Sequence, residues 1–104
     1  MIRKLSMFQR IVLMGILPEK GTFITLKLLR ELKEALAPTE VEVAKLGIRE
    51  NPMGGLTWDQ RKDTPVEIEI GDICTDLIRK TLLNLDKKEE LTSEHLSIYE
   101  VFIN

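Results

Sequence analysis

The sequence predicts a mainly helical α+β fold, with about five helices and a small antiparallel β-hairpin or three-stranded sheet inserted between helices 3 and 4. A chain of 104 residues that is 43% apolar and 31% charged suits one globular domain, so we expect a single domain over residues 1–104. Apolar residues recur at helical spacing along most of the chain, but they alternate as in strands between residues 47 and 71. Because only 5% of the residues are aromatic, aliphatic side chains must fill the core.

The first predicted helix covers residues 7–17 and is apolar at nearly every angle around its axis. Ser6 is its expected N-cap, and Pro18 ends it. Only Gln9 and Arg10 interrupt its apolar surface. Such a helix has to be covered on several sides, so either it is central in its own domain or part of it contacts another chain.

The second predicted helix, residues 23–36, is capped by Thr22 and is the clearest amphipathic helix of the chain. We expect its apolar arc to face the core: Ile24, Leu28, Leu29, Leu32, Ala35 and Leu36. The opposite face carries Lys27, Arg30, Glu31 and Glu34. Their i to i+4 spacing favours a self-neutralised, solvated face over a binding stripe.

A short third helix follows, because Thr39 and Glu42 have the spacing of a capping box and Gly47 suits a helix end. Short strands are then expected around Ile48, around residues 56–58 and over residues 66–70. In the last of these, Val66, Ile68 and Ile70 should point inward and Glu67 and Glu69 outward.

Two further helices complete the prediction. Asp72 is expected to cap a long helix that runs to about Lys88. Thr92 or Ser93 should cap a last helix that ends near Ile103.

The charge is uneven along a chain whose net charge is −2. Residues 1–47 carry eight bases against five acids, and residues 48–104 carry seven bases against twelve acids. The apolar run after the basic start is too short for a membrane span and lacks a small-residue cleavage site, so we expect a cytoplasmic protein without a membrane partner.

The sequence offers little catalytic inventory, and we expect no enzyme, no cofactor and no metal site. One cysteine, Cys74, and one histidine, His95, are too few for a four-ligand zinc site within one chain. As a nucleophile and base they would need to meet in a cleft. We instead expect Cys74 to pack in the core and His95 to be exposed or locally hydrogen-bonded.

The leading functional hypothesis is an interaction or assembly module that forms a homo-oligomer or serves as a small subunit of a larger complex. Phe8, Val12 and Ile16 of the first helix are the residues we expect to cross an interface. Trp58 has two interpretations, an anchor in the core or a contact residue at an edge beside basic side chains.

The alternative hypothesis is a DNA-binding regulator similar to winged-helix domains, in which three helices precede a strand pair. Its candidate nucleic-acid contacts are Lys45 on the third helix and Arg61 and Lys62 in the loop of residues 59–65. Glu40 and Glu42 argue against it, because carboxylates at the start of a recognition helix would repel phosphate.

Caps, turns and apolar anchors carry a resemblance to a known group of proteins. They lie in Leu17-Pro18, Gly21-Thr22-Phe23, Thr25-Leu26-Lys27, Glu69-Ile70-Gly71, Leu85-Asp86, Leu91-Thr92, Glu94-His95, Ser97, Tyr99 and Phe102. With these residues the chain resembles short proteins of unassigned function that are encoded in bacteriophage and prophage genomes. The resemblance implies an intracellular accessory protein of phage replication, regulation or virion assembly, and it brings no catalytic or binding residues.

Overall fold

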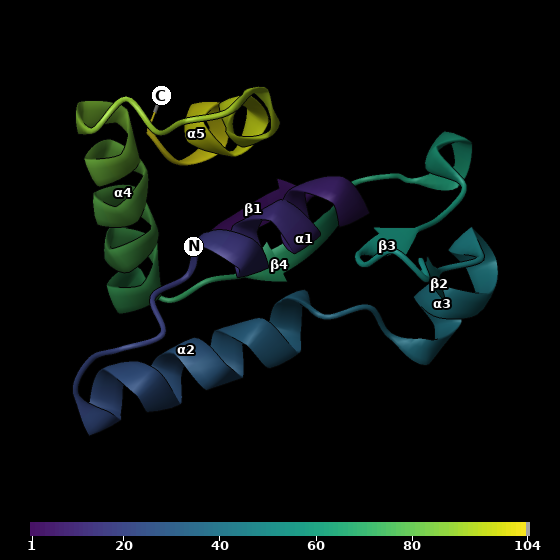
Figure 1. Cartoon of the computed structure of the whole chain (residues 1–104). Coiled ribbons are helices and arrows are strands. Elements are labelled where there is room, and N and C mark those ends of the chain that lie inside the picture. Colours follow the sequence, from purple (N-terminus) through teal and green to yellow (C-terminus); the bar gives the residue numbers. More distant parts are fainter. Residues whose placement is uncertain (104) are drawn as a thin grey trace.

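The computed structural model describes residues 1–103, which form five α-helices, two short 3-10 helices and two antiparallel two-stranded sheets (Figure 1). The α+β class, its helical majority and the strands between helices α3 and α4 are therefore as predicted. In chain order the elements are β1 (Ile2–Leu5), α1 (Met7–Ile16), α2 (Phe23–Leu36), α3 (Glu40–Leu46), β2 (Arg49–Glu50), β3 (Leu56–Thr57), η1 (Gln60–Lys62), β4 (Val66–Glu69), α4 (Asp72–Lys87), η2 (Ser93–His95) and α5 (Leu96–Phe102).

The strands pair differently from the simplest sequence interpretation. Strands β2 and β3 form the expected hairpin, with Arg49 opposite Thr57. Strand β4 does not join that hairpin but pairs antiparallel with β1, a strand at residues 2–5 that the sequence pattern did not indicate. The three-stranded alternative is thus wrong over the described residues. Long-range pairing of this kind leaves no local pattern, because its two strands are far apart in the chain.

Helix α1 lies in the middle of the molecule, with α2 on one side and α5 on the other (Figure 1). Helix α4 stands at one end and packs against both α2 and α5. The core they enclose is almost wholly aliphatic, as the composition predicts: Leu5, Leu13, Leu17, Leu29, Leu32, Leu36, Ile70, Cys74, Ile78, Leu82, Ile98 and Phe102.

The predicted caps of the first three helices are confirmed. The Ser6 hydroxyl accepts a hydrogen bond from the Gln9 backbone N–H at 3.2 Å, and Thr22 caps α2 in the same way. Thr39 and Glu42 form a capping box at α3. Helix α3 ends at Gly47, whose φ of +65° is favourable for glycine because it has no Cβ.

Four expectations about single residues are wrong, and one of them concerns Ala35 of α2, which is exposed instead of facing the core. The N-cap of α4 is Gly71, and Asp72 is already the first helical residue. Val66 is exposed rather than inward, because it lines an open hollow together with Lys62 and Asp63, whereas Ile70 is buried. Ile24 is 67% exposed instead of facing the core, because no other element covers the first turn of α2. The last helical segment begins as η2 before it continues as α5.

Candidate interaction surface

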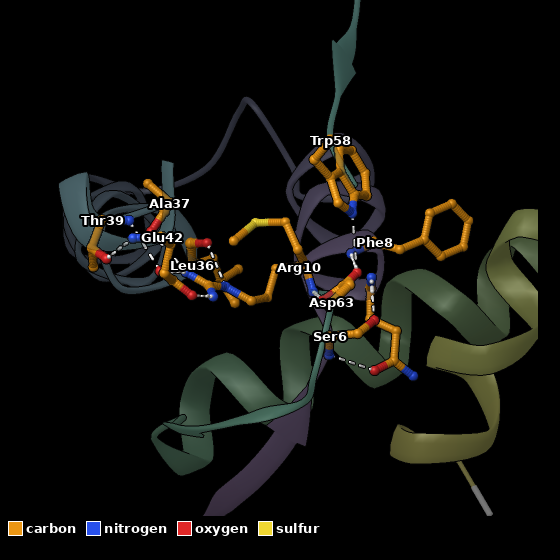
Figure 2. Close-up of polar contacts among 11 residues, drawn as sticks. Ser6, Phe8, Arg10, Leu36, Ala37, Thr39, Glu42, Trp58 and Asp63 are labelled. Atoms are coloured by element: carbon orange, nitrogen blue, oxygen red, sulfur yellow. Dashed lines mark hydrogen bonds and ion pairs between the residues drawn. The ribbon is translucent and has the colours of Figure 1, made fainter. Parts of the chain in front are cut away.

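The buried side chain of Arg10 links helix α1 to helices α2 and α3. It is 2% exposed, and its Nε donates a hydrogen bond to the carbonyl oxygen of Leu36 at 2.9 Å. Its Nη2 donates to the carbonyl oxygen of Ala37 at 2.9 Å and to Glu42 Oε1 at 3.0 Å, and its Nη1 donates to Glu42 Oε2 (Figure 2). The carbonyls at the end of a helix have no partner within the helix, and that end carries partial negative charge. The guanidinium therefore supplies hydrogen-bond donors to the end of α2 and to Glu42 of α3. The Glu42 carboxylate balances its buried charge.

The same contacts fix the charge of Glu42. Hydrogen bonds from the Arg10 guanidinium lower the pKa of this carboxyl from 4.5 to about 2, against the opposing effect of desolvation by burial. The backbone N–H of Thr39 also donates to Glu42 and lowers the pKa further. Glu42 is thus a structural carboxylate rather than a group held ready for proton transfer.

A second polar centre lies at the start of α1. Asp63 Oδ1 accepts from the backbone N–H of Met7 at 2.8 Å, and Oδ2 accepts from that of Phe8 and from Trp58 Nε1, both at 3.2 Å (Figure 2). Asp63 follows η1, so it reaches across from a segment distant in sequence to supply acceptors for the free N–H groups of a helix end. Asp63 thus has a structural role that no pattern in the sequence indicates.

The four predicted interface residues differ in exposure. Val12 and Ile16 are half-buried and pack against the core of their own chain. Phe8 is 38% exposed, and its ring points away from Asp63 (Figure 2). Trp58 is half-buried and anchored by its indole N–H, which is closer to the interpretation as a core anchor. Helix α1 thus buries Met7, Arg10 and Leu13 within its own domain and leaves the other side chains exposed or half-buried.

The three candidate nucleic-acid contacts lie at one end of the molecule but are interleaved with carboxylates. Lys45 and Lys62 line the same hollow of about 60 Å³, together with Glu42 and Asp63. The Arg61 side chain is 92% exposed, and its Nε contacts Asp59 Oδ1 at 3.2 Å. This mixture of charges does not form the continuous basic surface that binds a phosphate backbone, so the winged-helix hypothesis stays a prediction without structural support.

Cys74 and His95 occupy separate local environments. Cys74 is 7% exposed and contacts the carbonyl oxygen of Leu28, and burial raises the pKa of its thiol. His95 Nδ1 accepts from the backbone N–H of Thr92 at 3.0 Å, which is the local hydrogen bond expected for it. Within residues 1–103, no three His, Cys, Asp or Glu side chains are grouped as metal ligands would be. None of the helices described is long and apolar enough to cross a bilayer.

The largest apolar exposure in a helix lies instead at the start of α2. Phe23 is 81% exposed, Ile24 67% and Leu26 39%. We call these three residues the α2 apolar patch. Figure 1 shows α2 along one edge of the molecule, where nothing lies against its outer side. The helical period holds a signal that could have found Phe23, because at 100° per residue it falls on the charged face beside Lys27.

Charged side chains adjoin the α2 apolar patch. Lys27 and Arg30 line a shallow hollow together with Phe23 and Leu26. The other flank of the helix carries Glu31, which lines a groove against the start of α4. The outer side of α2 thus combines exposed apolar groups with charges of both signs.

No protein-family model, curated protein or solved structure matches this chain. Its function is therefore inferred from the geometry.

Proposed function

We propose that this protein is a non-enzymatic interaction module, which acts by self-association or as a small subunit beside a larger protein. The contact is made through the first turn of α2 and the outer side of that helix. The exposure of Phe23 and Ile24 is the observation that carries this proposal. Neither side chain contributes its apolar surface to the core of its own chain, and completely burying a side chain of this size contributes about 1.5–3 kcal/mol.

Two features of the scaffold support the proposal. Arg10 fixes the far end of α2 by hydrogen bonds to Leu36 and Ala37, so the helix presents its outer side from a braced position. Leu29, Leu32 and Leu36 bury the opposite side of the helix. Because the interacting side is already ordered, little conformational freedom is lost when a partner binds.

The biological setting is a separate part of the proposal. On the resemblance to phage-encoded and prophage-encoded proteins, we propose an intracellular accessory role in phage replication, regulation or virion assembly. A small module with one exposed helix suits such a role, because it can join a larger assembly without chemistry of its own.

Site-specific photo-crosslinking tests the proposed contact. The photoreactive residue p-benzoylphenylalanine is placed at position 23 in the full chain, and the matched control places it at Lys80, which is exposed on α4. We expect a discrete covalent adduct from position 23 and none from position 80, in cells that naturally express the chain. An adduct of two chain masses identifies self-association, and a larger adduct identifies another protein. Equal labelling from both positions, or none from either, would contradict the proposal.

A further inference from the structure

Strand β4 has one edge paired with β1 and one free edge. Met1 and Ile70 exchange two backbone hydrogen bonds, each of 2.8 Å, so they form a hydrogen-bonded pair at one end of the ribbon. In an antiparallel ladder such pairs alternate with non-hydrogen-bonded pairs, which makes Glu69 and Glu67 members of non-hydrogen-bonded pairs. The backbone N–H and C=O groups of these two residues therefore point to the free edge. No other segment within residues 1–103 supplies them with a backbone hydrogen bond.

A groove of about 220 Å³ lies between the end of β4 and helix α2. Figure 1 shows β4 on the side of β1 that faces α2. The groove is on the opposite flank of α2 from Phe23 and Leu26, which line a different hollow. Its floor is apolar and consists of buried side chains: Leu32, Ile70 and Cys74. A segment that pairs with the free edge of β4 can therefore also place apolar side chains on this floor.

The charged side chains that line the groove are both acidic. Glu31 lies on the α2 side and Glu69 on the β4 side, and both are exposed. Two salt bridges join side chains within residues 1–103, and neither involves these two carboxylates. Burial, and after it the negative charge of Glu31, raises the pKa of the Cys74 thiol, so the charge of Glu31 is felt at the floor. The groove therefore favours a partner with basic side chains.

We propose that this groove binds an extended segment of another protein, which adds a strand to the free edge of β4 and alternates basic with apolar residues. Added antiparallel, the more stable arrangement, the segment satisfies the free N–H and C=O groups of Glu67 and Glu69. Its residues opposite Glu67 and Glu69 share their face of the sheet, so bases are favoured there. The residues between them turn to the face of Ile68 and Ile70, where apolar side chains fit. This inference goes beyond the proposed function, because it does not use the α2 apolar patch.

A second copy of this chain fits the same edge less well. Two β4 edges would bring the Glu67 and Glu69 side chains of both copies together, and like charges opposite each other are destabilising. Strand β1 of a second copy offers one base to these two acids, Lys4, because Arg3 lies on the other face against the Phe102 ring. Its addition would also continue head to tail without closing.

Fluorescence anisotropy tests the proposal with the full chain and a labelled, terminally blocked peptide, Gly-Lys-Val-Lys-Val-Lys-Gly. At low salt we expect a dissociation constant of about 10–100 µM, and much weaker binding when glutamate replaces each lysine of the peptide. N-methylation of the lysine amides should weaken binding at least about tenfold, because these amides face β4 and lose their hydrogen bonds. The matched peptide is methylated at the valine amides, which face away from β4, and should bind like the unmethylated one.

Matched protein variants test the charges. Binding to E31Q/E69Q should be about fivefold weaker than to the unaltered chain, because two charge pairs are lost. Glu34→Gln is the control, because Glu34 is an exposed acid of α2 that does not line the groove. Circular dichroism confirms that every variant keeps its helical content.

Amide hydrogen exchange measured by NMR locates the bound peptide. With free peptide at about ten times its dissociation constant, exchange at Glu67 and Glu69 should slow about tenfold, because only the unbound state exchanges. The amides of Ile2 and Lys4 point to the free edge of β1 by the same register and should not change. The proposal is overturned if the basic peptide does not bind at up to about 1 mM protein. It is also overturned if the acidic or lysine-methylated peptide binds equally well, or if Glu67 and Glu69 exchange unchanged. Slower exchange at both edges with rising protein concentration and no peptide would assign the groove to a second copy instead. None of these failures touches the crosslink at position 23, which tests the proposed function separately.

Discussion

Helices α1 and α2 pack against each other, yet they use their apolar side chains in opposite ways. Helix α1 has apolar residues around most of its circumference and buries Met7 and Leu13 completely or nearly so. Helix α2 has a regular amphipathic pattern, but its first turn leaves Phe23 and Ile24 in solvent. The more apolar helix is the enclosed one, and the more ordinary helix carries the exposed patch.

The exposure of the apolar side chains of a helix therefore depends on which other elements cover it, and not on its composition alone. Helix α1 contacts β1, α2 and α5, so several sides are covered. Helix α2 extends past its neighbours at its N-terminal end, so its first turn has nothing to pack against (Figure 1). The polar residue within α1, Arg10, is accommodated because it meets the unpaired carbonyls at the other end of α2.

The largest effect is expected from a core substitution in α1. Leu13→Ala should lower the free energy of unfolding by about 2–5 kcal/mol, because Leu13 is fully buried and a cavity would remain. Urea denaturation followed by circular dichroism measures this loss. Leu83→Ala on the exposed side of α4 is the control and should cost under about 1 kcal/mol. A mild effect of Leu13→Ala would show that α1 is not central to the core.

The next effect concerns the polar link between the two helices. Arg10→Ala should lower the free energy of unfolding by about 2–4 kcal/mol, because two α2 carbonyls and Glu42 lose their donor. Arg79→Ala, an exposed arginine on α4, is the matched control and should change stability by about 0.5 kcal/mol or less. Equal effects of the two substitutions would mean that the buried guanidinium does not brace α2.

A smaller effect depends on pH. Because the pKa of Glu42 is lowered from 4.5 to about 2, its contribution is present above pH 4.5 and disappears as the pH falls toward 2. Its side chain is 21% exposed, so we expect solvent screening to limit this contribution to about 1–2 kcal/mol. Glu42→Gln should therefore be less stable than the unaltered chain at pH 7 and equally stable near pH 2. A difference that persists unchanged at the acid end would refute the assignment, and Glu34→Gln serves as the exposed control.

The smallest effect on stability is expected at the exposed start of α2, and it tests the contrast between α1 and α2 most directly. Phe23→Ser should change the free energy of unfolding of the monomer by about 0.5 kcal/mol or less, because the ring is 81% exposed. The measurement is urea denaturation of a dilute sample, where association does not contribute. If this substitution destabilises the monomer as strongly as Leu13→Ala does, then the start of α2 belongs to the core and the proposed contact surface fails.

Much of the fold was predictable because caps and periodicity are local. Ser6, Thr22 and Thr39 cap the helices that follow them, and Gly47 ends α3, as their positions in the sequence indicate. The hairpin of β2 and β3 is local as well, and it lies where the alternation begins. The pairing of β1 with β4 was missed because each strand is short and its partner is distant in the chain.

The sequence does not select the residues of the candidate surface. Composition and pattern indicated an interaction module, but they directed attention to Val12 and Ile16, which pack against the core. The sequence pattern does not single out Phe23, because Phe23 is the first residue of a helix with a regular amphipathic pattern. Asp63 was passed over because its hydrogen-bond donors, Met7 and Phe8, lie at the opposite end of the sequence.

The amino-acid sequence alone predicts five α-helices, the caps of the first three and the aliphatic nature of the core, since these depend on neighbouring residues and on composition. The tertiary structure is needed to show which apolar residues are buried, which group balances the charge of Arg10 and which helix keeps an exposed apolar side. The physical reason is that burial depends on what covers a residue. In this chain the covering elements come from segments far apart in sequence, such as α5 over α1.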